Sequence, residues 1–253
     1  MKEEEFLLKR LKELSDSAWK KNIYTFTGFL NMAELSLFYK EAPSICASGH
    51  FYKVFGGMEL CERCMIRFGS EESFGYDVPF PIACIHIRPT LKKFSDALNH
   101  RDFLGALINL GIKRETLGDI VIRDNEAFVF CVEEMAEFIV DNLDRVKHTS
   151  VKCCVTENVP EISRENLKEC NINVPSLRLD CIVGEVYRLS RASAQGIIRE
   201  KKVFINGRLC ENNSCNLKAG DVVSVRGYGR FRFKGENYIS KKGRVNAGVE
   251  VFI

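Results

Sequence analysis

The sequence lacks any apolar run approaching the roughly 18 residues that a membrane-spanning helix needs. Residues 1–5 are mostly charged and no apolar stretch follows them, so we expect no secretory signal. No Gly-rich loop stands between a predicted strand and a predicted helix, which argues against a nucleotide-type cofactor. The chain has 45% hydrophobic and 28% charged residues, the composition of an ordinary folded protein, and this excludes a disordered chain.

Cysteine is abundant, with eleven in 253 residues. In a small secreted protein they would form disulfides, but here we expect free thiols in a reducing cytoplasm. Cys46 and His50, followed by Cys61 and Cys64, have a possible zinc-ligand spacing. So many cysteines also produce such a spacing by accident, and we predict no metal and no cofactor.

Residues 1–80 favour a mainly helical region. In the first segment, apolar residues recur on one helix face, with Lys and Glu on the other: Phe6, Leu7, Leu11, Leu14 and Ala18. A second apolar stretch at 33–39 predicts a helix that ends before Pro43, because the residue before a proline disfavours the helical conformation. Residues 44–81 give no clear pattern.

Residues 81–157 alternate between predicted strands and helices. We expect strands at 82–88, 119–123, 127–132 and 149–155, and helices over 103–110 and 133–143. The turn-forming residues between the two middle strands predict a hairpin. The order is βαββαβ, that of a ferredoxin-like (RRM-like) domain. Phe128 and Phe130 share one face of the third strand, where they either stack on RNA bases or pack into the core, and we favour the core.

Residues 158–175 contain two prolines and several charges, which predicts a linker before a last domain at 176–253. There, Ser176 and Ser190 are predicted to cap helices over 177–188 and 191–201. A strand at 203–205, a turn at Asn206-Gly207, a turn at 217–221, a strand at 222–226 and a β-rich tail at 231–253 follow. The expected fold class is α+β: a helical N-terminal region, a ferredoxin-like central domain and a small αα-plus-β C-terminal domain.

Basic charge is concentrated in the last third of the chain. From residue 175 onward there are fifteen Lys and Arg against seven Asp and Glu, a net charge of +8. Because the whole chain has a net charge of +3, residues 1–174 have a net charge of −5. A polyanion-binding module has this distribution, and so does a solvated basic face. The second helix of the domain begins with free N–H groups beside Arg191, which favours phosphate binding. The candidate RNA-binding residues are Arg178, Arg191, Ser193, Gln195, Arg199, Lys201, Lys202, Asn206, Arg226 and Arg230.

Four motifs stand out in this domain: Leu177-Arg178-Leu179-Asp180, Leu189-Ser190-Arg191-Ala192-Ser193-Ala194, Val203-Phe204-Ile205-Asn206-Gly207, and Gly220-Asp221 before Val225-Arg226-Gly227. Together they resemble the S-four RNA-binding domain, named for ribosomal small-subunit protein four. Residues 226–231, 100–107, 111–115 and 117–119 further resemble the YlmH-type bacterial proteins, from about residue 100 onward. The resemblance implies binding to rRNA of the large ribosomal subunit and to tRNA, with a role in rescue or quality control of stalled translation. Asp180 and Leu179 are expected to hold the domain together.

One position departs from the S-four pattern. The pattern usually has Gly after the second helix, whereas Lys201 stands there in this chain. A non-glycine residue in a left-handed cap costs roughly 1 kcal/mol. Either the helix ends differently or the chain accepts this strain.

We therefore expect a cytoplasmic RNA-binding protein that is not an enzyme and takes no small-molecule substrate. One alternative is an S-four-bearing RNA-modifying enzyme, but fewer than thirty residues follow Arg226, too few for a catalytic domain placed after this module. The others are a binder of free tRNA or mRNA and an adaptor that binds only protein.

Overall fold

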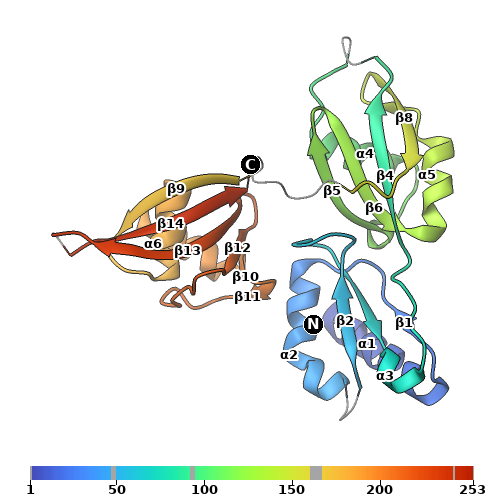
Figure 1. The fold of residues 1–253 in the computed structure, drawn as a ribbon, viewed down its shortest axis with the longest axis horizontal. Helices are drawn as coiled ribbons and strands as arrows, with labels where there is room; N and C mark the ends of the chain where they lie inside the picture. Colours follow the sequence, from blue (N-terminus) through green and yellow to red (C-terminus); the bar gives the residue numbers. More distant parts are fainter. Residues whose placement is uncertain (1, 47–49, 92–94, 160–166, 242, 253) are drawn as a thin grey trace. The chain divides into compact units, whose positions relative to one another are not determined.

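The computed structural model describes residues 2–46, 50–91, 95–159, 167–241 and 243–252, and it shows an α+β protein (Figure 1). The chain divides into two compact units, Met1–Glu161 and Ile162–Ile253. The N-terminal region and the central domain, predicted as separate, thus form one unit. No helix in the described part of the chain combines the length and the apolar character that a membrane span requires.

The N-terminal region consists of helices and a small antiparallel sheet. The helices are α1 (Lys2–Lys21), α2 (Met32–Ile45) and α3 (Glu71–Phe74); the strands are β1 (Thr25–Phe26), β2 (Tyr52–Phe55) and β3 (Met65–Phe68), in the order β1-β3-β2. Both predicted helices are confirmed, and Leu11 and Ala18 are fully buried. Phe6, predicted on the same buried face, is instead 74% exposed and lines an open groove. The three short strands were not predicted.

Helix α2 runs past Pro43, contrary to prediction. Its start is fixed by a capping box, in which the Asn31 side chain accepts from two backbone N–H groups and the Glu34 carboxylate accepts from the N–H of Asn31. The last turn buries Ala42 and Ile45. This apolar contact outweighs the penalty of a proline so close to the end of the helix.

The central domain has a five-stranded antiparallel sheet in the order β5-β6-β4-β8-β7. The strands are β4 (Ile82–Pro89), β5 (Leu117–Arg123), β6 (Glu126–Val132), β7 (Arg145–Val146) and β8 (Thr149–Val155). The α-helices are α4 (His100–Asn109) and α5 (Ala136–Asn142), with 3-10 turns η2 (Arg114–Thr116) and η3 (Glu133–Met135). Asp124 and Asn125, with φ of 51° and 65°, form the turn of the predicted β5–β6 hairpin.

The two faces of this sheet are covered differently. One face carries Ile85, Ile87 and Val129 and shares a core with Phe103 of α4 and Ile139 of α5. The other face contributes to a smaller core that joins the sheet to the N-terminal region: Cys84 and Phe130 of the sheet with Phe29 and Met65. Phe130 is only 1% exposed, so it packs in the core and does not stack on RNA.

The C-terminal unit places two helices, α6 (Leu179–Val186) and α7 (Arg191–Arg199), on one face of a six-stranded sheet (Figure 1). The strand order is β11-β10-β12-β13-β14-β9. The strands are β9 (Leu167–Val174), β10 (Val203–Ile205), β11 (Arg208–Leu209), β12 (Val222–Val225), β13 (Gly229–Ile239) and β14 (Val245–Phe252).

The predicted linker is wrong in part, since β9 lies within it. Strand β9 pairs along its whole length with β14 at the edge of the sheet. Ile172 and Val174 alternate inward and are buried beneath α6, which gives this polar segment a reason to be a strand. Residues 160–166 of the predicted linker lie outside the described residues.

The helix caps of this unit agree only in part with prediction. Ser190 caps α7 by accepting from the N–H of Ser193, as expected. Ser176 does not cap α6, because that helix begins two residues later than predicted, with Arg178 at the cap position. Both helices also end two residues early, before Arg188 and Lys201, whose φ values are 53° and 58°.

Candidate nucleic-acid interface

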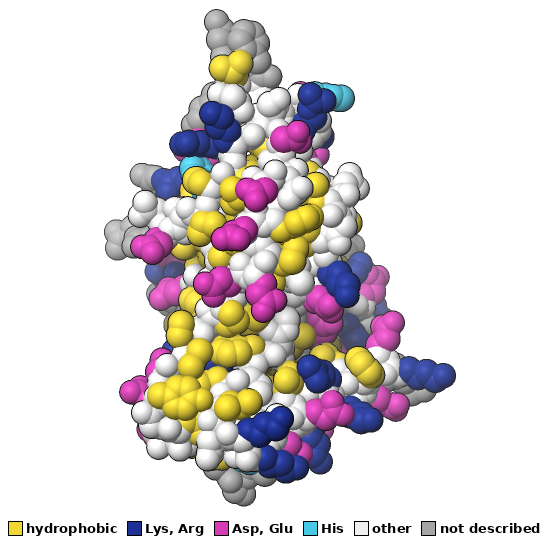
Figure 2. Space-filling view, turned by 90° about the vertical axis from the view of Figure 1, so that its right-hand side faces the viewer, with side chains coloured by type: hydrophobic (Ala, Val, Ile, Leu, Met, Phe, Trp, Pro, Cys, Tyr) yellow, Lys and Arg dark blue, Asp and Glu magenta, His cyan; other side chains and the backbone are white. Residues whose placement is uncertain are grey.

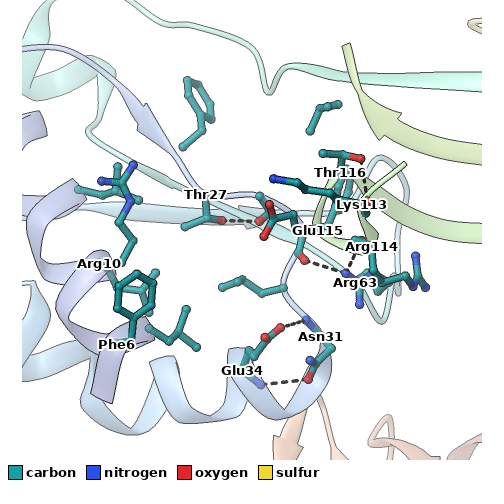
Figure 3. A pocket seen from close by; sticks show the side chains of 18 of the residues that line it. Phe6, Arg10, Thr27, Asn31, Glu34, Arg63, Lys113, Arg114, Glu115 and Thr116 are labelled. Atoms are coloured by element: carbon teal, nitrogen blue, oxygen red, sulfur yellow. Dashed lines mark hydrogen bonds between the residues drawn. The ribbon is translucent and has the colours of Figure 1, made fainter. Parts of the chain in front are cut away.

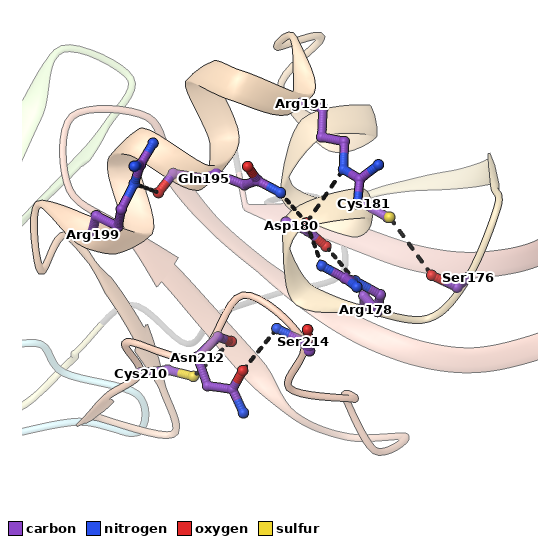
Figure 4. A network of polar contacts seen from close by, with 10 residues as sticks. All are labelled: Ser176, Arg178, Asp180, Cys181, Arg191, Gln195, Arg199, Cys210, Asn212 and Ser214. Carbon is purple, nitrogen blue, oxygen red and sulfur yellow. Dashed lines mark hydrogen bonds and ion pairs between the residues drawn. The ribbon is translucent and has the colours of Figure 1, made fainter.

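The buried carboxylate of Asp180 organises the start of α6 and the adjacent face of α7 (Figure 4). Arg178 donates to both of its oxygens, from Nε at 3.0 Å and from Nη2 at 2.9 Å. Gln195 of α7 donates from Nε2 at 2.9 Å, and Arg191 Nε lies 3.8 Å away. The side chain of Asp180 is fully buried, whereas those of Arg178 and Arg191 are 33% and 69% exposed. The buried negative charge of Asp180 is thus paired with the guanidinium groups of Arg178 and Arg191, which both remain partly exposed to solvent.

The ionisation of Asp180 reflects these contacts. Burial by itself would raise the pKa of the carboxyl, but the hydrogen bonds from Arg178 and Gln195 outweigh it and lower the pKa to about 2. The carboxylate is therefore charged at neutral pH. This supports the prediction that Asp180 holds the domain together.

The loop at residues 210–216 is hydrogen-bonded to the start of α6 through its backbone carbonyl groups. The backbone N–H of Leu179 donates to Cys215 O at 2.8 Å, and that of Asp180 donates to Asn213 O at 3.2 Å. Cys210, Asn212 and Ser214 of this loop lie beside the Asp180 network in Figure 4. Sequence patterns did not point to these hydrogen bonds, because they depend on backbone groups.

The N-terminal turn of α7 is open to solvent beside this network. Ser190, Arg191 and Ser193 are all exposed, and the hydroxyls of Ser190 and Ser193 lie 2.8 Å apart. Arg199, one turn beyond Gln195, is also exposed. The structure therefore brings together four of the predicted residues, Arg178, Arg191, Gln195 and Arg199, on or beside one side of α7, whereas Ser193 lies on the other side of that helix.

Lys201 adopts the left-handed conformation that the S-four pattern assigns to glycine. Its φ is 58°, its N–H donates to Ile198 O, and the N–H of Lys202 donates to Ile197 O. These two bonds are those of a Schellman motif. The chain thus accepts the predicted strain, and the Lys201 ammonium lies 3.5 Å from Glu211.

The remaining predicted residues are placed less directly for RNA. Lys202 pairs with Glu200 at 2.6 Å. The side-chain amide of Asn206 donates to Asp221 and accepts from the N–H of Val222, so it stabilises the sheet. The guanidinium of Arg226 lies over the buried ring of Phe204.

Arg230 is not brought together with Arg191. Its neighbour Phe231 faces the helices and is fully buried, so Arg230 points to the opposite face of the sheet, where it lies 5.1 Å from the ring centroid of Phe252. Strand alternation would have separated these two arginines from sequence alone.

The central domain holds a ring that the sequence reasoning missed. On the first strand of this domain, the imidazole of His86 stacks on Phe128 with ring centroids 4.4 Å apart and planes 3° from parallel. The signal for it was the alternation that places residue 86 opposite residue 128 across two paired strands.

An open groove of about 1000 Å³ lies in the first unit, between α1, residues 26–31 and residues 113–116 (Figure 3). Arg63 donates to the backbone oxygens of Phe29, Arg114 and Leu117, and so joins the N-terminal region to the central domain. Burial, and the nearby charge of Arg63, lower the pKa of Arg114 to about 10. Asn31 and Glu34 form the capping box of α2. These polar groups of the groove thus have structural roles.

The candidate zinc ligands have other contacts. The ring of His50 stacks on Trp19 at 4.7 Å, and the Cys64 thiol donates to Cys61 O at 3.5 Å. Burial raises the pKa of Cys64 to about 12, which disfavours the thiolate. Within the part of the chain that the structure describes, no three His, Cys, Asp or Glu side chains are grouped to hold a metal ion.

Charge of both signs covers the face shown in Figure 2, where Lys, Arg, Asp and Glu side chains are mixed with hydrophobic ones. Net charge on that face therefore does not mark a polyanion site by itself. The geometry around Asp180 is the more specific indication.

Comparison with known proteins gives three similarities. Residues 77–159 match a family described as the putative RNA-binding domain in YlmH. The ribosome-associated protein quality control protein P2 of Bacillus subtilis (strain 168) is 28% identical over 179 residues, 69% of this chain and 68% of the relative. The solved structure of the cell division protein ylmH from Streptococcus pneumoniae aligns with a TM-score of 0.49 and 20% identity, over 62% of this chain and 95% of that chain. The family match and the curated relative support a YlmH-type RNA-binding domain at the centre of this chain.

Proposed function

We propose that this protein binds structured RNA of the large ribosomal subunit, together with tRNA, and serves rescue or quality control of stalled translation in the cytoplasm. The contact is made by the Asp180-organised face of α6 and α7. It acts by binding and not by catalysis.

One observation carries the proposal: the buried Asp180 carboxylate fixes Arg178 and Gln195 beside the open N-terminal turn of α7, with Arg191 exposed. A guanidinium held in place by a carboxylate loses little freedom when it binds phosphate, and the N–H groups of the helix add to the attraction. Such an array reads the position of a sugar-phosphate backbone, which suits structured RNA.

The domain architecture supports this reading. We interpret the α6–α7 pair on its small sheet as an S-four-type domain. The βαββαβ order and the strand order β5-β6-β4-β8 are those of a ferredoxin-like domain. The proposed association with the ribosome is supported by the similarity to the ribosome-associated protein quality control protein P2 of Bacillus subtilis.

The non-enzymatic part of the proposal rests on the first unit's groove. Its Thr27 hydroxyl donates to Gly28 O, Asn31 and Glu34 cap α2, and Arg63 is bonded to backbone oxygens. These groups are engaged in holding the fold, which supports binding over catalysis.

The test is co-sedimentation of the full chain with small subunits, large subunits, and large subunits whose tRNA sites are filled, at several salt concentrations. We expect pelleting with large subunits that weakens as salt rises, because phosphate contacts release counterions. Arg191→Glu should weaken it. Lys241→Glu, the same charge change outside α6 and α7, should not.

Two results would redirect the proposal. Failure to pellet with either subunit, together with tight binding to free tRNA or mRNA, would replace the ribosome by a free RNA. If the protein binds no RNA at all, the proposal is overturned. If mass spectrometry detects modified bases in the bound RNA, the claim that the protein is not an enzyme is overturned.

A further inference from the structure

The face of the central sheet turned away from α4 and α5 carries a row of exposed basic side chains. Arg123 on β5, Arg88 on β4, Lys152 on β8 and Arg145 on β7 are all exposed. Arg88 stands directly opposite Lys152 in the β4–β8 pair. We call these four residues the basic row.

Strand alternation places the basic row on this face. The chain neighbours Ile87, Val146 and Val151 are buried in the core shared with α4 and α5. Since successive side chains of a strand point to opposite faces, Arg88, Arg145 and Lys152 point away from the helices. Arg123 is opposite Glu126, which lies two residues before Phe128 on the same face.

Two stacked rings lie beside the row. His86 and Phe128 are cross-strand partners with parallel rings 4.4 Å apart, and His86 Nε2 lies 2.6 Å from Glu126 Oε2. This bond fixes the plane of the imidazole. The side chain of His86 keeps 20% of its surface exposed, so the stack reaches solvent.

The N-terminal region covers only part of this face. Cys84 and Phe130 are buried against Phe29 and Met65, and a Cβ at Gly57 would lie 2.2 Å from the Phe130 ring. Four residues beyond Cys84 on β4, Arg88 is exposed, and so are its partner Lys152 and Cys154 on β8. Within the described residues of the first unit, the face therefore has a covered apolar half and an open half with rings and basic groups.

We propose that the open half of this face binds a short stretch of single-stranded RNA. A base extends the His86–Phe128 stack, and the neighbouring phosphates lie on the basic row. The row crosses four inter-strand spacings of about 4.8 Å, roughly 19 Å in all, which matches a few nucleotides. The inference deepens the proposed function, on which it rests, by adding a second RNA contact distinct from that of α6 and α7.

The chemistry favours RNA over an acidic protein. Phosphates and acidic side chains are both attracted to the basic row, but flat, partly exposed rings add affinity for bases in particular, and the attraction does not depend on sequence. Glu126, the acidic residue beside the rings, is already bonded to His86. The four cations of the basic row, with this one carboxylate beside the rings, leave the face positive.

The test is fluorescence anisotropy of the full chain with a labelled, unstructured RNA octamer over a salt series. Arg88→Glu with Lys152→Glu should weaken binding at least tenfold and reduce the salt slope by about 1.4, at about 0.7 for each phosphate contact on a single strand. His86→Ala should weaken binding about fivefold or more with little change in slope, since stacking carries no charge. Arg88→Gln with Lys152→Gln, checked by circular dichroism, guards against loss of fold.

Arg101→Glu on α4 is the matched control, because Arg101 is exposed on the side of the sheet that carries the helices. It should bind as the wild type does. Octamer binding that is unchanged in the Arg88 and Lys152 variants would overturn the inference. The inference would also be overturned if His86→Ala bound the octamer as tightly as the wild type and polyglutamate displaced the octamer. That pair of results would indicate a site for an acidic protein.

The same variants separate this inference from the proposed function. If they pellet normally with large subunits while Arg191→Glu does not, and octamer binding is unaffected, the inference fails and the proposed function stands. If octamer binding is lost as predicted but no variant affects pelleting, the sheet site stands and the ribosomal role of α7 fails.

Discussion

Asp180→Asn removes the charge that organises the α6–α7 face while preserving the size of the side chain. An amide has one oxygen where the carboxylate has two, so it cannot accept from Arg178 at both positions and from Gln195 as well. Its NH₂ group also faces the Arg178 guanidinium. The change therefore tests whether the buried carboxylate holds the site.

The pKa of Asp180 sets the size of the effect. A pKa lowered from 3.8 to about 2 corresponds to about 2 kcal/mol of folding free energy. For a unit of the size of Ile162–Ile253, this lowers the melting temperature by about 8–16 °C. The folded-state pKa is depressed, so this stability is present above pH 3.8 and is lost as pH falls toward 2. Wild type and variant should therefore converge over that range.

The assay is urea unfolding at pH 7 with two probes. Trp19, the single tryptophan, lies in α1 and reports the first unit, whereas circular dichroism reports both units. Asp180→Asn should shift the circular dichroism transition to lower urea and leave the fluorescence transition in place.

RNA affinity separates two explanations of the site. Asp180→Asn makes the domain more positive by one charge, so a purely electrostatic interface would bind RNA more tightly. If Asp180 positions Arg178 and Gln195, binding weakens instead. A variant as stable as the wild type that binds RNA equally well or better would refute the positioning role of Asp180.

Three further substitutions test other parts of the structure. Lys201→Gly should stabilise the protein by about 0.5–1 kcal/mol in urea unfolding, because glycine adopts φ of 58° without strain, and an unchanged midpoint would contradict this. Gly57→Ala should cost about 2 kcal/mol or more by Trp19 fluorescence, since its Cβ would lie 2.2 Å from Phe130 and φ is +105°. Arg63→Met should destabilise the first unit by about 3 kcal/mol, because the carbonyl groups of Phe29 and Arg114 lose this donor and that of Leu117 keeps only Arg114 Nη1; retention of wild-type stability would show that water replaces the guanidinium.

The elements with regular alternation were the ones that could be predicted. Four of the five strands and both helices of the central domain, the Ser190 cap and the Asn206-Gly207 turn follow from local pattern and turn chemistry, whereas the two-residue strand β7 was not predicted. The left-handed conformation of Lys201 was one of the two alternatives that its place after the second helix left open.

The elements that depend on distant partners were missed. Strand β9 carries Lys168 and Glu169 and reads as a linker, and it is a strand because β14, some seventy residues later, supplies its hydrogen bonds. The short strands β1 to β3 have too few residues to show a period. The N-terminal region covers Phe130 but leaves His86 partly open, and no local pattern reports which half of a sheet another segment will cover.

For the candidate site, the sequence indicated which residue types are present better than it indicated where each side chain lies. The cations on α7 were identified correctly as exposed, but Asn206 stabilises the sheet and Arg230 lies on its opposite face. The 210–216 loop contacts α6 through backbone carbonyl groups, which every residue has. No side chain in the sequence therefore indicates this contact.

The most direct test of the central claim is the affinity of purified large ribosomal subunits for wild type, Arg191→Glu, Arg191→Gln and Lys241→Glu across a salt series. The account predicts strong salt dependence for the wild type and Lys241→Glu, and for the two Arg191 variants a weaker affinity with a salt slope smaller by about one. Equal affinities and slopes for all four proteins would contradict the claim that the N-terminal turn of α7 binds RNA phosphate.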